Sequence, residues 1–200
     1  MADPSPLVEL IGIFDRLRRE CPWKAAQTHE SLARYLIEES HEAVEAIESG
    51  DVDAMRDELG DVLLQVYLHA EIAAQAGAFD VEDVATGLRD KMIRRNPHVF
   101  GDEQELARTG DPAAINERWQ QIKAQERDRN GILDGVPVSL PALARAAKLV
   151  DRADRAGTPV EADPTSADLG EQLLALVVAA HDAGVDPEGA LRAAVRRREG

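Results

Sequence analysis

The sequence predicts an all-α protein, and three observations support this prediction. Of the 200 residues, 44% are hydrophobic but only 4% are aromatic, so the core must consist mainly of Leu, Val, Ile and Ala. Apolar residues recur over long stretches with the period of an amphipathic helix. Runs of alternating β-branched residues, which are typical of strands, are absent from the sequence. We therefore expect packed helices rather than a β-sandwich.

Cap and breaker residues delimit the expected helices in chain order. Pro22 ends the first helix because it biases the residue before it away from helical geometry. Thr28 is a plausible N-cap, Gly50 and Gly77 are C-terminal signals, and Asn96-Pro97 is a stop. The helices predicted on this basis span about 7–19, 28–48, 52–75, 81–95, 111–128 and 141–156, with a final helical hairpin over 168–198.

The same pattern predicts a division of the chain into three parts. These are a helical domain over 5–128, a turn-rich linker over 129–141 and a smaller helical part over 142–200. The last part echoes the first, since Leu59-Gly60-Asp61-Val62 resembles Leu169-Gly170-Glu171-Gln172. Chance remains the alternative to a duplication. We expect this extension to be structural or regulatory, because it has only one acidic helix.

Composition excludes several classes of protein. A net charge of −15 argues against direct nucleic-acid binding, which requires a basic surface. Cys21 is the only cysteine, so no internal disulfide can form. Residues 1–14 lack the basic start of a signal peptide, and the longest apolar run, 173–180, is too short for a membrane span. We expect a cytoplasmic protein that does not enter a membrane.

Four carboxylates are predicted to lie on core-facing helix surfaces. With Leu36 at the centre of the apolar stripe of its helix, Glu39 lands at the edge of that stripe and Glu42 follows one turn later. Glu58 and Asp61 share a face of the next helix, which is apolar on nearly every side. That helix should be buried on both sides, which predicts that Asp61 is not a surface acid.

Inward carboxylates need a partner, because an ionised acid in an apolar core is costly. Four on two helices would hold one or two hard cations, and an all-oxygen site that keeps waters suits Mg²⁺, with Mn²⁺ as the alternative. A di-iron or di-manganese bundle does not fit. Such a bundle needs two Glu-x-x-His pairs, and only Glu38-x-x-His41 has that form.

Cations and aromatic residues elsewhere are candidates for binding an anionic ligand. Lys91 and Arg95 are one turn apart beside Arg94, so they can grip one substrate, although a cationic helix end explains them equally. Three further candidates could stack on a base or read its edge: Trp23, Gln27 and Trp119. For each tryptophan the alternative is packing in the core or an interface.

A series of motifs in one order identifies a resemblance. The motifs are Cys21-Pro22-Trp23, Gln27-Thr28-His29, Tyr35-Leu36-Ile37-Glu38-Glu39-x-x-Glu42, Glu58-Leu59-Gly60-Asp61 and the run from Lys91 to Gly101, extended by Trp119 and Ile122-Lys123. This half of the chain resembles a MazG-type nucleoside triphosphate pyrophosphohydrolase.

The resemblance implies an all-α helical bundle that intertwines with a second chain on dimerisation. It implies Mg²⁺-dependent hydrolysis of a nucleoside triphosphate to the monophosphate and pyrophosphate, a nucleotide-pool house-cleaning activity. It assigns the metal to Glu39, Glu42, Glu58 and Asp61. It places Glu38 near the attacking water, and Lys91 and Arg95 on the phosphates.

Departures from the family pattern leave alternatives open. Lys24 stands where an acid is usual and Asn96 where His is common, which puts base recognition in question. The abbreviated second half puts the assembly in question; we expect a homodimer, with a tetramer as the alternative. Two alternative functions stay open. One is a narrow-specificity all-α nucleotide pyrophosphatase, of dUTP/dCTP or phosphoribosyl-nucleotide type. The other is a non-catalytic helical interaction protein.

Overall fold

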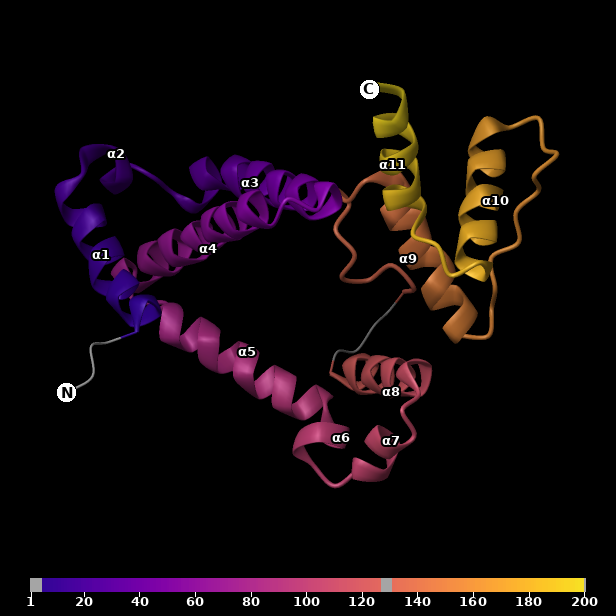
Figure 1. The fold of residues 1–200 in the computed structure, drawn as a ribbon, viewed down its shortest axis with the longest axis horizontal. Helices are drawn as coiled ribbons and strands as arrows, with labels where there is room; N and C mark the ends of the chain where they lie inside the picture. The colour runs from indigo at the N-terminus through magenta and orange to yellow at the C-terminus, as the bar shows by residue number, and fades with distance from the viewer. Residues whose placement is uncertain (1–4, 127–130, 200) are drawn as a thin grey trace. The chain divides into compact units, whose positions relative to one another are not determined.

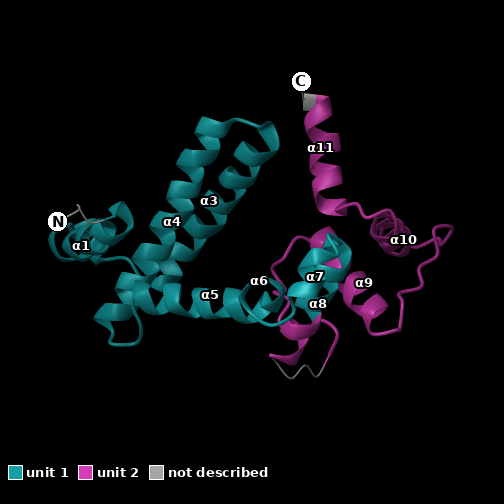
Figure 2. Cartoon of the chain, turned by 60° about the horizontal axis from the view of Figure 1, so that its bottom comes forward, with its two compact units in different colours: residues 1–120 teal, residues 121–200 magenta. Residues whose placement is uncertain are grey.

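The chain folds into helices, as predicted (Figure 1). The computed structural model describes residues 5–126 and 131–199, and no strand occurs within those two ranges. The chain divides into two compact units, residues 1–120 and 121–200 (Figure 2). The helices are α1 (Pro6–Glu20), α2 (Pro22–Ala25), α3 (His29–Ser49), α4 (Val52–Gln75), α5 (Val81–Arg95), α6 (Pro97–Phe100), α7 (Gln104–Arg108), α8 (Pro112–Gln125), α9 (Ala142–Arg155), α10 (Leu169–Asp182) and α11 (Pro187–Glu199).

Local capping explains where the two longest helices begin and end. The Thr28 hydroxyl accepts a hydrogen bond from the backbone N–H of Ser31, and the Ser31 hydroxyl oxygen accepts one from Thr28 N–H. Gly50, at φ 77°, ends α3 in the left-handed conformation that glycine adopts without strain. Asp51 then caps α4 by accepting from two N–H groups of its first turn. The predicted ends of α3 and α4 are therefore confirmed.

The core of unit 1 lies where α1 and α3 pack on α4. Helices α3 and α4 form an antiparallel hairpin and lie side by side in both views (Figures 1 and 2). Four buried side chains form the centre of the core: Phe14, Leu32, Tyr67 and Leu68. The rings of Phe14 and Tyr67 stack at 5.4 Å, and the Tyr67 hydroxyl donates to the Leu7 carbonyl oxygen at 2.6 Å. Helix α4 is thus the element on which both α1 and α3 pack.

The buried stripe of α3 differs from the predicted one. Leu36 is 37% exposed and Ile47 is 53% exposed, whereas Leu32, Ala43 and Ala46 are buried. The small alanine side chains allow α3 and α4 to approach closely on that side. At 100° per residue the stripe is turned by about 45° from Leu36 toward Ala46. This rotation places Glu39 within the stripe rather than at its edge.

The prediction that α4 is buried on both sides is wrong for the single chain. Leu59 is 49% exposed and Val66 is 36% exposed, and Asp61 is a surface residue. The contacts from α1 reach the later part of α4, through Tyr67 and Gln75. The first turns of α4 therefore pack mainly against α3, which leaves Asp61 open to solvent.

Unit 2 has a small core of its own. Val150 and Ala153 of α9 and Val177 of α10 are buried. Arg152 donates to the carbonyl oxygens of Ile132 (2.7 Å) and Asp134 (2.9 Å), which holds the irregular segment before α9. Residues 127–130 lie outside the described residues, so the predicted boundary between 128 and 129 stays a prediction. None of the described helices is long and apolar enough to cross a membrane.

Candidate functional site

Three of the four predicted metal ligands converge at the α3–α4 hairpin. Carboxylate oxygens of Glu39 from α3 and of Glu58 and Asp61 from α4 lie within 4.8 Å of one another. Glu58 and Asp61 share a face because they are three residues apart on one helix. Their meeting with Glu39 depends on the packing of α3 against α4. We call these three residues the acidic cluster.

Desolvation and the repulsion between neighbouring carboxylates raise the pKa of two glutamates of the acidic cluster. Partial desolvation, and then the charges of Asp61 and Glu42, raise the pKa of Glu39 above its ordinary value. Desolvation, followed by the charges of Glu42 and Asp61, raises the pKa of Glu58 in the same direction. The carboxylates of Glu39 and Glu58 are therefore stabilised by a proton or another positive charge nearby.

Glu42 and Glu38 flank the acidic cluster on α3. Glu42 is exposed and is not among the three converging residues, but its charge raises the pKa of both Glu39 and Glu58. Glu38 is exposed and makes a smaller contribution to the raised pKa of Glu39. An all-oxygen donor set of this kind fits a hard divalent cation, which takes carboxylates and retains waters.

A short segment before α3 carries two more of the predicted residues, Trp23 and Gln27. Trp23 is 51% exposed, so the interpretation of this residue as a core tryptophan is wrong. The Gln27 side-chain amide donates to the Trp23 carbonyl at 2.9 Å, and its oxygen accepts from the Ser31 hydroxyl at 2.8 Å. Gln27 is therefore engaged in local hydrogen bonds that shape this segment.

Two residues that sequence reasoning did not select surround Trp23. Tyr35 of α3 contacts the indole edge-on at 6.4 Å between ring centroids, and the ammonium of Lys24 lies 4.9 Å from the indole centroid. Tyr35 is one turn before Glu39 on α3. Tyr35 belongs to the motif on which the family resemblance rests. Its four-residue spacing from Glu39 could therefore have identified it as a site residue from the sequence.

The predicted phosphate-binding cations lie on the last turns of α5. Lys91 is half-buried and Arg94 is exposed. The Arg95 guanidinium lies 5.0 Å from the ring centroid of Trp119, which brings together two of the predicted substrate residues. Helix α5 runs away from the α3–α4 hairpin in both views (Figures 1 and 2), so these cations are not brought to the acidic cluster of the same chain.

Three further polar residues of α3 and α4 were not identified as site residues from the sequence. Nδ1 of His29 lies 2.8 Å from Nδ1 of His69, with the rings stacked. Gln65 of α4 is buried and lies one turn before His69. Single polar residues within an apolar helical stretch give no signal of their own, because their surroundings depend on the partner helix.

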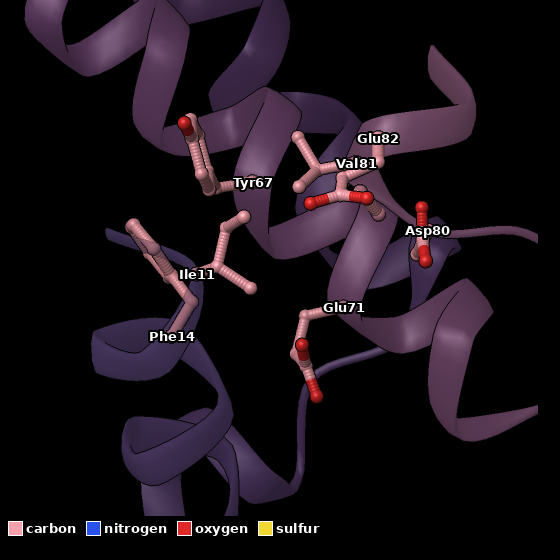
Figure 3. Close-up of a pocket in the computed structure, with 8 residues that line it drawn as sticks. Ile11, Phe14, Tyr67, Glu71, Asp80, Val81 and Glu82 are labelled. Atoms are coloured by element: carbon pink, nitrogen blue, oxygen red, sulfur yellow. The ribbon is translucent and has the colours of Figure 1, made fainter. Parts of the chain in front are cut away.

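A cavity of about 240 Å³ lies elsewhere in unit 1. Figure 3 shows its apolar residues and the carboxylates beside them. The lining residues come from α1, α4 and the start of α5: Ile11, Phe14, Tyr67, Ala70, Glu71, Asp80, Val81 and Glu82. It contains none of the predicted site residues, so the candidate site is the acidic cluster and not this cavity.

Comparison with known proteins identifies the family of the chain. Residues 27–100 match the family described as the MazG nucleotide pyrophosphohydrolase domain. The chain is 38% identical to the nucleoside triphosphate pyrophosphohydrolase/pyrophosphatase MazG of Thermotoga maritima, over 94% of this chain and 81% of that protein. The chain belongs to the MazG family. The matched residues 27–100 include the acidic cluster and the α5 cations.

Other relatives differ in how much of their length this chain covers. It is 46% identical to an uncharacterized 26.1 kDa protein in the blaB 3′ region of Streptomyces cacaoi, over 94% of this chain and 77% of that protein. It is 40% identical to the nucleoside triphosphate pyrophosphohydrolase of Mycobacterium tuberculosis, over 94% of this chain but only 54% of that protein. This MazG chain therefore spans about half of the longer relative.

Proposed function

We propose that this MazG chain hydrolyses nucleoside triphosphates to nucleoside monophosphate and pyrophosphate, with a divalent cation at the acidic cluster. The observation that carries the proposal is the convergence of Glu39, Glu58 and Asp61 from two helices. The names of the relatives support the reaction class. The donor set favours Mg²⁺, with Mn²⁺ as the alternative.

Each acidic residue has a role in this proposal. Glu39, Glu58, Asp61 and the flanking Glu42 hold the cation. When bound, the cation supplies positive charge to the triphosphate oxygens and lowers the pKa of bound water. Glu38 accepts a proton from the water whose oxygen attacks the α-phosphorus. The bond from that phosphorus to the pyrophosphate oxygen then breaks.

The remaining candidates contact the nucleotide. Lys91, Arg94 and Arg95 bind the phosphates, while Trp23, Gln27 and Trp119 contact the base or sugar. Because α5 runs away from the hairpin, we propose that a second copy of the chain supplies one of the two sets of groups. The exposed Leu59 and Val66 of α4 support association, since a two-fold contact would bury them.

The test is pyrophosphate release from eight NTPs and dNTPs, with Mg²⁺ and with EDTA, for the wild type and Glu39→Gln. We expect cation-dependent release from the wild type and its loss in the variant. Glu45→Gln is the matched control, because Glu45 is an exposed glutamate on the same helix. Loss of activity in Glu45→Gln as well would contradict the assignment to the acidic cluster.

The panel also separates the competing functions. Release from a single nucleotide would support the narrow-specificity pyrophosphatase. Absence of release from every nucleotide would support the non-catalytic helical interaction protein. A cytoplasmic location and a homodimer, with a tetramer as the alternative, stay predictions that fractionation and light scattering can test.

A further inference from the structure

A buried carbonyl oxygen beside the acidic cluster lacks a hydrogen-bond partner. Gln65 of α4 is only 3% exposed, and its side-chain oxygen Oε1 is buried without a donor. Buried polar groups in native proteins are almost always hydrogen-bonded. An orphaned acceptor of this kind indicates a donor that the protein itself does not supply, such as a water or a hydrated ion.

The helix geometry places Gln65 next to the acidic cluster. Asp61, Gln65 and His69 follow one another at four-residue spacing, so they lie on one face of α4. Helix α3 contacts this face at two levels, through Glu39 near Asp61 and through His29 against His69. Gln65 therefore lies in the α3–α4 contact, one turn from Asp61 and between these two levels.

A water held by a cation at the acidic cluster is the donor that best fits this position. Mg²⁺ keeps several of its waters when carboxylates bind it, and such waters are strong donors. A neutral carboxamide oxygen accepts a hydrogen bond and adds no negative charge beside Glu39 and Glu58, whose pKa values are already raised by desolvation and by neighbouring carboxylates. Groups beyond the ligands orient bound waters and commonly change metal affinity by about 10- to 100-fold.

We propose that Gln65 is a positioning residue of the acidic cluster. Its Oε1 atom accepts a hydrogen bond from a water bound to the divalent cation, and it thereby fixes that water relative to Glu39 and Asp61. The inference rests on the cation of the proposed function. It adds a residue that neither the sequence motifs nor the family match distinguishes.

The test replaces Gln65 by methionine, which has a similar length but no hydrogen-bonding oxygen. The measurement is Mn²⁺ affinity without nucleotide, by electron paramagnetic resonance, together with the unfolding midpoint in EDTA. We expect an affinity loss of about 10-fold or more. The midpoint in EDTA should not fall, because an unsatisfied buried acceptor is removed. Gln104→Met, at an exposed glutamine of α7, is the control.

A competing donor is an internal water shared with His69, whose Nε2 is also buried without a partner. In that case Gln65→Met would leave the Mn²⁺ affinity within twofold of the wild type, and the proposal would be overturned. Gln65→Leu repeats the measurement if the methionine variant does not fold. Absence of Mn²⁺ binding by the wild type would instead overturn the cation site itself, so the two failures are distinguishable.

Discussion

His29 and His69 join the first turn of α3 to the later part of α4. Their Nδ1 atoms are 2.8 Å apart and the rings are parallel within 5°. At that separation one nitrogen must donate and the other accept, so the contact requires at least one neutral ring. Burial, and then the neighbouring His29, lower the pKa of His69. The pair therefore favours the state with His69 uncharged.

Acidification should destabilise the fold through His69. Its pKa is lower in the folded chain than in the unfolded chain, so the unfolded chain binds more protons between the two values. The stability contributed by His69 is present above the ordinary histidine pKa, about 6.5, and is lost as the pH falls below it. The measurement is the unfolding midpoint at pH 7.5 and at pH 5.5.

The comparison that isolates His69 uses His69→Gln and, as control, His41→Gln on the exposed side of α3. The midpoint should fall less on acidification in His69→Gln than in the wild type, and by the wild-type amount in His41→Gln. The acidic cluster is present in all three proteins, so its contribution to the change of the midpoint with pH cancels in the comparison. An equal fall in all three would show that the imidazole pair does not resist protonation.

The acidic cluster should give the opposite pH dependence when no cation is present. The pKa values of Glu39 and Glu58 are higher in the folded chain than their ordinary value. The folded chain then binds more protons than the unfolded chain, so stability falls as the pH rises through the window above the ordinary glutamate pKa. In EDTA at pH 7, Glu39→Gln should therefore unfold at a higher temperature than the wild type.

Added Mg²⁺ should reverse that order, because the cation binds the folded wild type and stabilises it by mass action. The midpoint of the wild type should rise with Mg²⁺ and that of Glu39→Gln should not. Glu45→Gln should follow the wild type in both conditions. A wild-type midpoint that does not respond to Mg²⁺ would exclude a cation site at the acidic cluster.

Helix limits could be predicted because the residues that set them are local. Thr28, Gly50 and Asp51 act within one turn of their own positions, so the sequence contains the whole interaction. The short helices α2, α6 and α7 were not predicted. Each has only four or five residues, too few for an apolar period to become visible.

The candidate site could be predicted only in part, because its geometry depends on packing between helices. The i, i+3 spacing of Glu58 and Asp61 is a property of one helix and was sufficient to pair them. The rotation of α3 that places Glu39 in the contact depends on Ala43 and Ala46 packing against α4. The exposure of Asp61 depends on where α1 ends its contact with α4, which no local pattern encodes.

Arg18 should control the segment that carries Trp23 and Gln27. Its guanidinium donates to the carbonyl oxygens of Lys24, Ala25 (3.1 Å) and Gln27 (3.0 Å), and to Oε1 of Gln75 at 2.9 and 3.1 Å. Lysine cannot reproduce this fork. Arg18→Lys should cost about 1.5–3 kcal/mol of stability, measured by urea unfolding, since hydrogen bonds from a charged donor are lost.

If Trp23 and Gln27 contact the nucleotide, Arg18→Lys should also raise KM more than it lowers kcat. The control is Arg16→Lys, which alters only an exposed pair with Glu20 on the same helix. Surface pairs of that kind contribute about 0–1 kcal/mol, so its unfolding curve should nearly overlay that of the wild type. A similar loss in both variants would mean that the guanidinium fork of Arg18 has no special role.

Arg95 and Trp119 should act together on the nucleotide. The guanidinium of Arg95 lies 5.0 Å from the indole centroid, so stacking orients the planar group on α5, and a planar guanidinium is the group that binds phosphate bidentately. Arg95→Lys keeps the positive charge but replaces the planar guanidinium, which stacks on the indole, with an ammonium group. We expect KM for a nucleoside triphosphate to rise about 10-fold, which corresponds to about 1.4 kcal/mol of lost binding.

Trp119→Leu should produce a similar rise in KM with Arg95 intact, and the double variant should be no worse than the poorer single variant, because the two side chains form one unit. Arg89→Lys is the control, since Arg89 is exposed on the same helix and pairs with Asp90. The measurement is a double-mutant cycle on KM and kcat. Fully additive losses would show that the contact between Arg95 and Trp119 is not used in binding the nucleotide.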